Sequence, residues 1–149
     1  MTVLGDAVVH VTTVTIIAAA EGIPEHCRVR AVIAPATDLE VDLPTSWNGR
    51  FYMSGNGGPA GELQDEPSRT GPRDRALRFG FVTASTNAGH NRKDEPLFTF
   101  ARDQQKLIDY GYRAVHLTAE AGKRAAALYY AIPIRHAYWD SCSTGGRKD

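Results

Sequence analysis

The sequence has little of several features that mark common classes of protein. Its 17 lysines and arginines are balanced by 17 aspartates and glutamates, and they form no basic patch, which argues against nucleic acid as a partner. No apolar run approaches the roughly 18 residues that a membrane span needs, so we expect no membrane partner either. None of the five histidines has a metal-ligand spacing to another histidine or to a cysteine, and we therefore predict no metal site and no cofactor.

Cysteine is also scarce, and the two that are present leave the redox environment open. Cys27 and Cys142 lie far apart in the chain. They fit buried small hydrophobic residues in a cytosolic protein, or half-cystines in a secreted one. The apolar segment 14–20 is short and lacks a basic leader, so it predicts a buried first strand rather than a signal peptide.

The length of 149 residues fits a single domain, and the order of the predicted elements indicates an α/β layered fold. Apolar alternation and β-branched residues predict strands at 7–20, 27–33, 39–43, 51–53, 77–85 and 136–139. Helical spacing predicts helices at 98–110 and 112–130, and the polar segment 62–75 with its prolines predicts a surface loop. In the second helix the residues predicted to face inward are Val115, Ala119, Ala121, Ala125, Leu128 and Tyr129.

The last dozen residues contain a pattern that carries chemistry. Ser141, Ser143 and Gly145 form a small-x-Ser-x-Gly sequence behind an apolar strand, as in a nucleophile elbow, which is a tight turn between a strand and a helix. Such a turn exposes its central serine and tolerates only small residues two positions to either side. We therefore predict that Ser143 is a catalytic nucleophile. The alternative interpretation is an ordinary turn rich in serine and glycine.

A glycine-dense segment at 55–61 follows the predicted strand at 51–53. In hydrolases with such an elbow, one N–H of the oxyanion hole comes from the residue after the nucleophile, here Thr144, and another from a glycine-rich loop after an early strand. A phosphate-binding loop fits less well, because no Gly-Lys-Ser/Thr follows and the glycine spacing is wrong. An ordinary wide turn is the other interpretation.

The acid and the base that would activate this serine are not evident in the sequence. Hydrolases of this kind carry them after the nucleophile, in the order Ser, Asp or Glu, His, and only 144–149 follow here. Asp140 is too close along the strand to act as the acid, so we interpret it as structural. His90 is the histidine best placed for a pocket, although a structural role is favoured for all five. We therefore expect an N-terminal portion of an enzyme, inactive alone.

Four blocks of sequence together resemble the tannase and feruloyl esterase family of α/β-hydrolases. They lie in family order and extend over nearly the whole chain: Cys27-Arg28-Val29, Leu43 to Gly58, Gly80 to His90, and Trp139 to Arg147. The combination of Trp-Asn-Gly-Arg-Phe in the second block with Cys-Ser-Thr-Gly-Gly-Arg in the fourth is specific. Three positions depart from the family pattern: Ser141 stands where glycine is usual, Lys148 where glutamine is usual, and Pro59 where an aromatic residue is common.

The resemblance implies a serine carboxylic ester hydrolase that acts on phenolic acid esters, such as galloyl or feruloyl esters. Ser143 would attack the ester carbonyl, and Thr144 with Gly58 or Gly57 would form the oxyanion hole. The alternative is a non-catalytic module that uses the truncated fold to bind a phenolic ligand or a partner chain. An uncovered sheet edge would favour self-association of such a portion.

The resemblance also implies that 1–149 form a single partial α/β-hydrolase domain, with a mixed sheet, antiparallel first strands and an end at the elbow. The C-terminal catalytic segment would lie outside it, as would the lid domain with the structural calcium of some members. Cys142 would be a half-cystine that pairs with a cysteine beside the catalytic histidine, and Cys27 a second half-cystine with a partner outside the chain. Members of the family are largely secreted or periplasmic.

Overall fold

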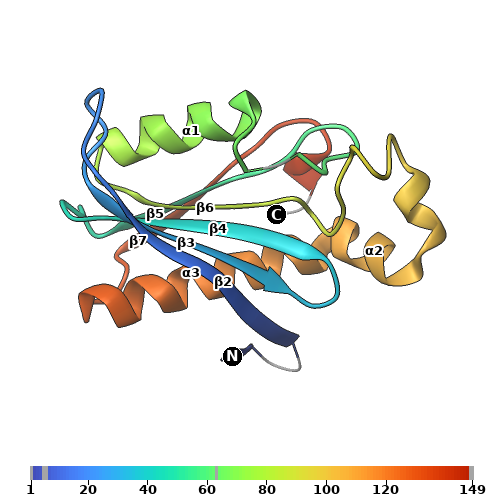
Figure 1. The fold of residues 1–149 in the computed structure, drawn as a ribbon, viewed down its shortest axis with the longest axis horizontal. Helices are drawn as coiled ribbons and strands as arrows, with labels where there is room; N and C mark the ends of the chain where they lie inside the picture. The colour runs from blue at the N-terminus through green and yellow to red at the C-terminus, as the bar shows by residue number, and fades with distance from the viewer. Residues whose placement is uncertain (1, 5–6, 63, 148–149) are drawn as a thin grey trace.

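The computed structural model describes residues 2–4, 7–62 and 64–147. Within these ranges a mixed sheet of seven strands has the order β1-β2-β3-β4-β6-β5-β7 (Figure 1). The strands are β1 (Thr2–Leu4), β2 (Ala7–Ile17), β3 (His26–Ile33), β4 (Thr37–Pro44), β5 (Arg50–Ser54), β6 (Val82–Thr86) and β7 (His136–Asp140). Neighbouring strands are antiparallel from β1 through β4 to β6, whereas β5 is parallel to both β6 and β7. The predicted mixed sheet with antiparallel first strands is confirmed.

Helices cover both faces of this sheet. In Figure 1, α1 (Pro67–Arg78) lies on one side of the strands and α3 (Ala114–Tyr130) on the other. Short helical segments lead from β6 to α3 at one end of the sheet: η1 (Thr99–Arg102), α2 (Gln104–Ile108) and the π-helical η2 (Asp109–Arg113). The turn η3 (Gly145–Arg147) lies at that same end. The α/β layering predicted from the sequence is therefore present.

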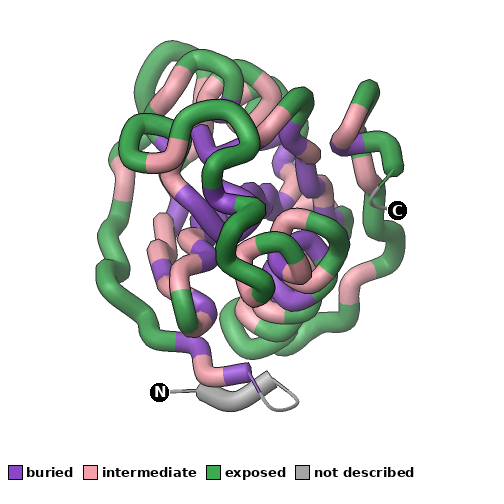
Figure 2. Tube along the Cα trace, turned by 90° about the vertical axis from the view of Figure 1, so that its right-hand side faces the viewer, coloured by how far each residue is buried: buried purple, intermediate pink, exposed green. Residues whose placement is uncertain are grey.

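The apolar core lies between α3 and the sheet. Its strand residues include Val41, Phe51 and Val82, each at most 2% exposed, and Figure 2 shows the buried segments gathered in the middle of the molecule. Gly122 lets α3 approach closely, because a Cβ at this position would lie 2.8 Å from the Phe51 ring. The glycine that weakens this helix by propensity is thus required by its packing on the sheet.

The inward face of α3 differs from the prediction in its last turn. The predicted inward residues before residue 126 do pack against the core. Leu128 and Tyr129, however, are 78% and 47% exposed. Tyr130 takes the inward position instead: its ring stacks on Trp47 with a centroid distance of 4.2 Å, and its hydroxyl donates a hydrogen bond to the Pro44 carbonyl. The ring stacking and the hydrogen bond of Tyr130 therefore orient the last turn of α3, and Leu128 and Tyr129 face outward.

The segment 62–75, predicted to be a surface loop, contains most of α1, so that prediction is wrong. Pro67 occupies the start of the helix, where a missing N–H has no intrahelical partner to lose. The buried face includes Arg69, so no apolar stripe marks the helix in the sequence. The following strand begins at Val82 rather than at Leu77, because Leu77 belongs to the last turn of α1.

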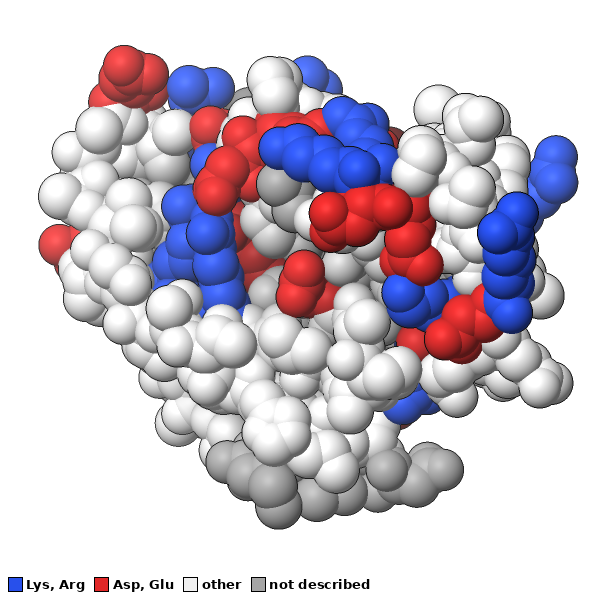
Figure 3. All heavy atoms as spheres, turned by 45° about the vertical axis from the view of Figure 1, so that its right-hand side comes forward, with Lys and Arg blue, Asp and Glu red and all other residues white. Residues whose placement is uncertain are grey.

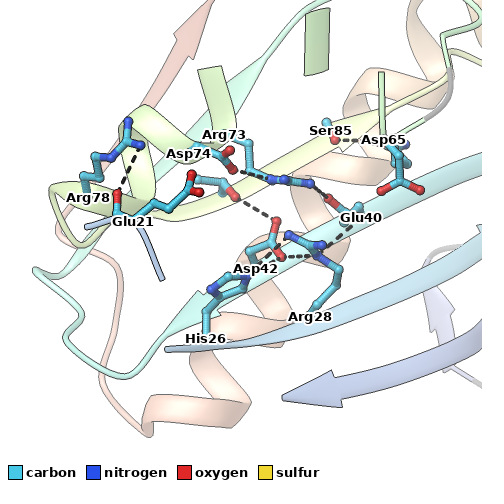
Figure 4. A network of polar contacts seen from close by, with 12 residues as sticks. Glu21, His26, Arg28, Glu40, Asp42, Asp65, Arg73, Asp74, Arg78 and Ser85 are labelled. Carbon is cyan, nitrogen blue, oxygen red and sulfur yellow. Dashed lines mark hydrogen bonds and ion pairs between the residues drawn. The ribbon is translucent and has the colours of Figure 1, made fainter. Parts of the chain in front are cut away.

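Two carboxylates on β4 lie beneath α1, on the sheet face opposite the apolar core. Glu40 and Asp42 are each 1% exposed. Figure 4 shows Arg73 of α1 reaching Glu40, with 3.0 Å between Nη1 and Oε1. From β3, Arg30 donates to Glu40 and Arg28 donates to Asp42, each at 2.7 Å. An ion pair between Arg73 and Glu40 thus joins this part of α1 to the sheet, and the pairs from Arg28 and Arg30 join β3 to β4.

Because these ion pairs are buried, we expect substitution of one paired residue to lower the free energy of unfolding. Removing one member of a buried ion pair typically destabilises a protein by about 3–5 kcal/mol, because the other charge is left without compensation.

The charged side chains at the surface are arranged differently. On the face drawn in Figure 3, basic and acidic side chains alternate over the same band, with no broad field of one sign.

We predict that Asp42→Asn changes how stability depends on pH. Burial, and next the neighbouring Glu40, raise the pKa of Asp42 to about 6, whereas an aspartate in an unfolded chain has a pKa of roughly 3.9. Between about pH 4 and pH 6 the folded state holds a proton that the unfolded state has lost, so this group's contribution to the free energy of unfolding falls as pH rises. Urea denaturation measures the free energy of unfolding of both proteins at about pH 4.5 and about pH 7. From the lower to the higher pH, the wild type should lose stability relative to Asp42→Asn.

Asp65→Asn serves as the control, because a hydrogen bond from Arg30 lowers the pKa of Asp65 instead. Its contribution to stability is present above the unfolded pKa and is lost only as pH falls below it. Between about pH 4.5 and about pH 7, the stability of the wild type relative to Asp65→Asn should stay constant or rise with pH. A difference between wild type and Asp42→Asn that stays constant with pH would contradict the prediction.

Candidate active site

Strand β7 runs into a tight turn that holds Ser143 in the left-handed region. Its φ is +57°, a conformation that destabilises a residue with a Cβ by about 1–3 kcal/mol and persists only where surrounding contacts impose it. The residue is exposed, and η3 begins at Gly145, two residues further on. A strand, a strained and exposed serine, and the start of a helix make up the geometry of a nucleophile elbow.

The glycine loop 55–61 lies beside this turn because β5 and β7 are parallel neighbours. Ser54 and Asp140 pair at the C-terminal ends of the two strands, and the Gly55 N–H donates to the Asp140 carbonyl at 3.0 Å. The segments that follow β5 and β7 therefore leave the sheet at the same place. The two regions that the sequence singled out are brought together.

The contact between loop and turn is close enough to require two glycines. A Cβ at Gly55 would lie 2.7 Å from the Cβ of Ser141 and 2.7 Å from the Trp139 ring. A Cβ at Gly145 would overlap the Ser141 hydroxyl and lie 2.7 Å from the Asn56 carbonyl oxygen. Ser141, one of the departures from the family pattern, is thus accommodated by the absence of side chains opposite it, whereas Lys148 lies outside the described residues.

Three backbone N–H groups around this turn have no acceptor in the part of the chain that the structure describes. Within the described residues, no hydrogen bond is donated by the N–H of Gly57, Gly58 or Thr144. Gly57 and Gly58 are exposed, and nothing lies within 4 Å of a Cβ built at either position. Unpaired donors beside open space are what the stabilisation of a developing negative charge requires.

The described histidines do not activate Ser143. No hydrogen bond or ion pair in the described chain joins Ser143 to a histidine or a carboxylate. His90 is 1% exposed and stacks on Phe100 with a centroid distance of 3.9 Å. His136 begins β7, at the end of the strand remote from the turn. The structural role favoured for His90 agrees with this placement.

Asp140 has a structural partner, in agreement with its interpretation from the sequence. The Tyr52 hydroxyl donates to its Oδ2 at 2.6 Å. Burial, together with this hydrogen bond, raises the pKa of Tyr52, so the phenol stays protonated and the bond is retained at ordinary pH. Asp140 thereby ties the end of β7 to β5 just before the turn.

Both cysteines are free thiols in the described chain and do not pair with each other. Cys27 is 6% exposed on β3, and burial, with a smaller effect of Asp42, raises its pKa. This is the environment of a small buried hydrophobic residue. Cys142 is exposed beside Ser143. The disulfides implied by the family resemblance, with cysteines outside the chain, remain predictions.

An apolar groove of about 480 Å³ lies along β7 on the side of α3, with Phe51, Met53, Val115 and Trp139 among its lining residues. Only Trp139 of the β7 residues is partly buried, and the others are exposed.

Among the described residues, no helix is long and apolar enough to cross a membrane. No group of three or more His, Cys, Asp and Glu side chains in the same part of the chain is arranged to hold a metal ion.

Sequence reasoning missed two side chains that hold the glycine loop. Arg69 on α1 donates from Nη2 to the Gly55 carbonyl at 2.8 Å, and Tyr110 donates to the Gly58 carbonyl at 2.7 Å. Arg69 lies in the segment predicted to be a loop, and Tyr110 at the end of a predicted helix. Neither has a local signal, because only the tertiary fold brings them to these carbonyls.

The layered mixed sheet and the strained serine turn define part of a hydrolase fold. Residues 22–149 match the sequence profile described as Tannase and feruloyl esterase, and the chain belongs to this family. It is 33% identical over 148 residues to mono(2-hydroxyethyl) terephthalate hydrolase of Piscinibacter sakaiensis, a match over 88% of this chain and 24% of that protein. It is 37% identical over 109 residues to feruloyl esterase B of Aspergillus niger, over 73% of this chain and 20% of that protein.

Solved structures show the same relationship. Feruloyl esterase B from Aspergillus oryzae superposes with a TM-score of 0.76 at 26% identity, over 99% of this chain and 31% of that one. An esterase from Aspergillus oryzae superposes with a TM-score of 0.75 at 28% identity, over 94% of this chain and 31% of that one. The chain spans about a quarter of the length of its curated relatives.

We predict that Gly145→Ala destabilises the protein. The added Cβ would overlap Ser141 and press on the Asn56 carbonyl, and overpacking of this kind lowers the free energy of unfolding by about 1–3 kcal/mol. Gly146→Ala is the matched control: its Cβ would meet no atom nearer than the Ser141 carbonyl oxygen at 3.7 Å, so its effect should stay within about 0.5 kcal/mol. Urea denaturation of both variants provides the measurement.

The double variant Ser141→Gly with Gly145→Ala separates the two overlaps. It should recover part of the lost stability and not all of it, because the Asn56 carbonyl still lies 2.7 Å from the new Cβ. Equal stability of Gly145→Ala and Gly146→Ala would show that the loop and the turn are not in the close contact described above.

Proposed function

We propose that these residues form the nucleophile half of the active site of a serine carboxylic ester hydrolase. The observation that carries the proposal is the strained and exposed Ser143 at the end of β7, with φ of +57°, beside the unpaired amides of the glycine loop. Membership of the tannase and feruloyl esterase family supports the reaction class. The proposed substrates are phenolic acid esters, such as feruloyl or galloyl esters, in line with relatives named feruloyl esterase B.

In the proposed reaction, the Ser143 hydroxyl oxygen attacks the ester carbonyl carbon while its proton passes to a base. The carbonyl oxygen takes the negative charge, and two backbone N–H groups stabilise it by an amount that reaches several kcal/mol per donor in acyl-transfer enzymes. Collapse of this intermediate expels the alcohol, which takes up the proton from the base. Water then hydrolyses the acyl-enzyme, releases the acid and restores the serine.

The proposed donors are the N–H groups of Thr144 and Gly58. Thr144 follows the nucleophile directly. Peptide geometry favours Gly58 over Gly57, because the C=O and N–H of a trans peptide point in opposite directions. The Asn56 carbonyl lies against Gly145, so the N–H of Gly57 points away from the turn. The Gly57 carbonyl accepts from Ala60 N–H at 3.1 Å, which leaves the N–H of Gly58 on the outer side of that small turn.

The base and the acid that orients it are proposed to come from polypeptide outside 1–149. A serine hydroxyl without an adjacent base is a weak nucleophile at neutral pH, and no described histidine is hydrogen-bonded to Ser143. The exposed Cys142, next to the nucleophile, is the proposed half-cystine that joins this turn to the segment with the catalytic histidine. The 149 residues alone are therefore proposed to be inactive.

A non-catalytic binding module is the second candidate. The observation that favours it is the apolar groove of about 480 Å³ along β7, in a chain whose described residues offer Ser143 no base. The two candidates differ in what they require of Ser143: the esterase needs its hydroxyl, and the module does not.

Hydrolysis of methyl ferulate and methyl gallate by the longest natural polypeptide that contains these residues tests the proposal. Ser143→Ala should lower kcat/KM at least roughly a thousandfold, since the nucleophile is removed. Ser68→Ala, at an exposed serine of α1, should leave it unchanged. Activity that survives Ser143→Ala would exclude Ser143 as the nucleophile.

The 149-residue chain alone gives the second arm of this test. Wild type and Ser143→Ala should hydrolyse the same esters at equal, background rates, because the base is missing. A rate that depends on Ser143 in this short chain would contradict an external base and would place the base among the histidines already present.

A further inference from the structure

We propose that Tyr110 is a positioning residue for the oxyanion hole: its hydroxyl holds the glycine loop so that the N–H of Gly58 keeps its place. This inference rests on the proposed function. Tyr110 donates to the Gly58 carbonyl oxygen at 2.7 Å, although the two residues are 52 positions apart. The accepting carbonyl and the proposed donor N–H belong to the same residue, Gly58. The hydrogen bond therefore restrains the backbone on which the position of the donor depends.

The loop has little else to hold it at this point. Gly57 and Gly58 are exposed, and glycine backbones are freer than those of any other residue. Gly58 also has a φ of +53°. Pro59 follows and has no N–H with which to anchor the chain. Among the described residues, the Gly57 carbonyl accepts from Ala60 and the Gly58 carbonyl accepts from the hydroxyl of Tyr110, so this hydroxyl fixes the peptide between Gly58 and Pro59.

Tyr110 is itself held in place on several sides. Its ring lies 4.9 Å from the ring of Phe100 and 6.1 Å from that of Phe98, measured between centroids. The buried His90 lies edge-on to it at 6.3 Å. A phenol packed in an aromatic cluster loses little further entropy when its hydroxyl binds, so the bond to the loop is formed in advance of substrate.

The π-helical η2 explains why Tyr110 points at the loop. Its first residue, Asp109, has no exposed surface and accepts hydrogen bonds from Arg113 and Gln105. A Cβ at Gly89 would meet Asp109, so the loop after β6 is packed against this residue. With Asp109 turned inward, Tyr110 faces the glycine loop. Single π-helical turns inside α-helices are frequent at functional sites.

The expected kinetic effect follows from when the oxyanion exists. The negative charge develops in the transition state and not in bound substrate, so a misplaced donor lowers kcat and leaves KM nearly unchanged. Tyr110→Phe keeps the ring and removes only the hydroxyl. In the longest natural polypeptide that contains these residues, it should lower kcat for methyl ferulate about tenfold, below the roughly hundred- to thousandfold loss seen when a donor is removed outright.

Tyr112→Phe is the matched control. Tyr112 lies in the same π-helical turn and is 65% exposed, and its hydroxyl has no hydrogen bond with the described residues. It should retain the wild-type kcat, which is the quantity that Tyr110→Phe is expected to lower. Thermal unfolding of both variants, compared with wild type, separates an effect on the loop from a general loss of stability.

Amide hydrogen exchange in the 149-residue chain gives a readout that does not depend on activity. The reporters are the N–H of Ala60, bonded to the Gly57 carbonyl, and the N–H of Gly61, bonded to the Asn87 carbonyl. Tyr110→Phe should raise their exchange rates at least about fivefold, the effect of losing about 1 kcal/mol of local order. Tyr112→Phe should leave them at the wild-type rate.

The outcomes separate this inference from the proposed function. If Ser143→Ala keeps the esterase activity, the proposed function fails and the role of Tyr110 fails with it. If Ser143→Ala abolishes activity while Tyr110→Phe matches Tyr112→Phe in kcat, the esterase stands and Tyr110 has no positioning role. Unchanged exchange at Ala60 and Gly61 in Tyr110→Phe would overturn the inference even if kcat fell.

Discussion

The parallel pairing of β5 with β7 is the constraint on which the candidate site depends. Its register sets Ser54 opposite Asp140, and both chains then leave the sheet side by side. The proposed catalytic groups depend on that exit: the segment after β7 carries the strained Ser143 with the N–H of Thr144, and the segment after β5 carries the N–H of Gly58. Loops placed by a rigid sheet in this way are where binding and catalytic groups are usually found. Side chains such as Arg69 and Tyr110 refine a placement that the sheet has already made.

The two faces of the sheet are stabilised by different physical means. Toward α3 the contact is apolar and close, to the point that Gly122 has no room for a methyl group. Toward α1 it includes the buried Leu77 but also an ion pair from Arg73 to Glu40, with Glu40 and Asp42 buried among arginines. Apolar burial tolerates small shifts of a helix, whereas paired charges at hydrogen-bond distance fix direction and register. Arg73, which pairs with Glu40, and Arg69, which donates to the Gly55 carbonyl, both belong to α1, so the helix that contacts the glycine loop is also held to the sheet by a directional pair of charges.

The sequence predicted most of the strands, the long helix and the elbow, because each has a local signature, but the expected burial of 14–20 is wrong, since Val14 and Ile16 are 63% and 61% exposed. The periodicity of the segments and the small residues around Ser143 were enough, and the family resemblance gave the order of the elements. It did not predict α1, since the buried face of that helix includes Arg69 and its prolines at Pro67 and Pro72 are typical of a loop. It also misplaced Leu128 and Tyr129, because the anchor of Tyr130 is a tertiary contact. The partners of the glycine loop were missed for the same reason: a hydrogen bond across 52 positions leaves no pattern in the chain.

The crowding around Ser141 has a consequence for how this family can diversify. With serine at this position, alanine is excluded at Gly55 and at Gly145, so the three sites form an epistatic set. Glycine in place of the serine would remove its hydroxyl from both contacts, but an alanine at position 55 would still lie 2.7 Å from the Trp139 ring. At position 145 the same change is also insufficient, since the Asn56 carbonyl closes the remaining space. Each of these two glycines is therefore required by two neighbours at once, and no single substitution at position 141 would allow either of them to vary.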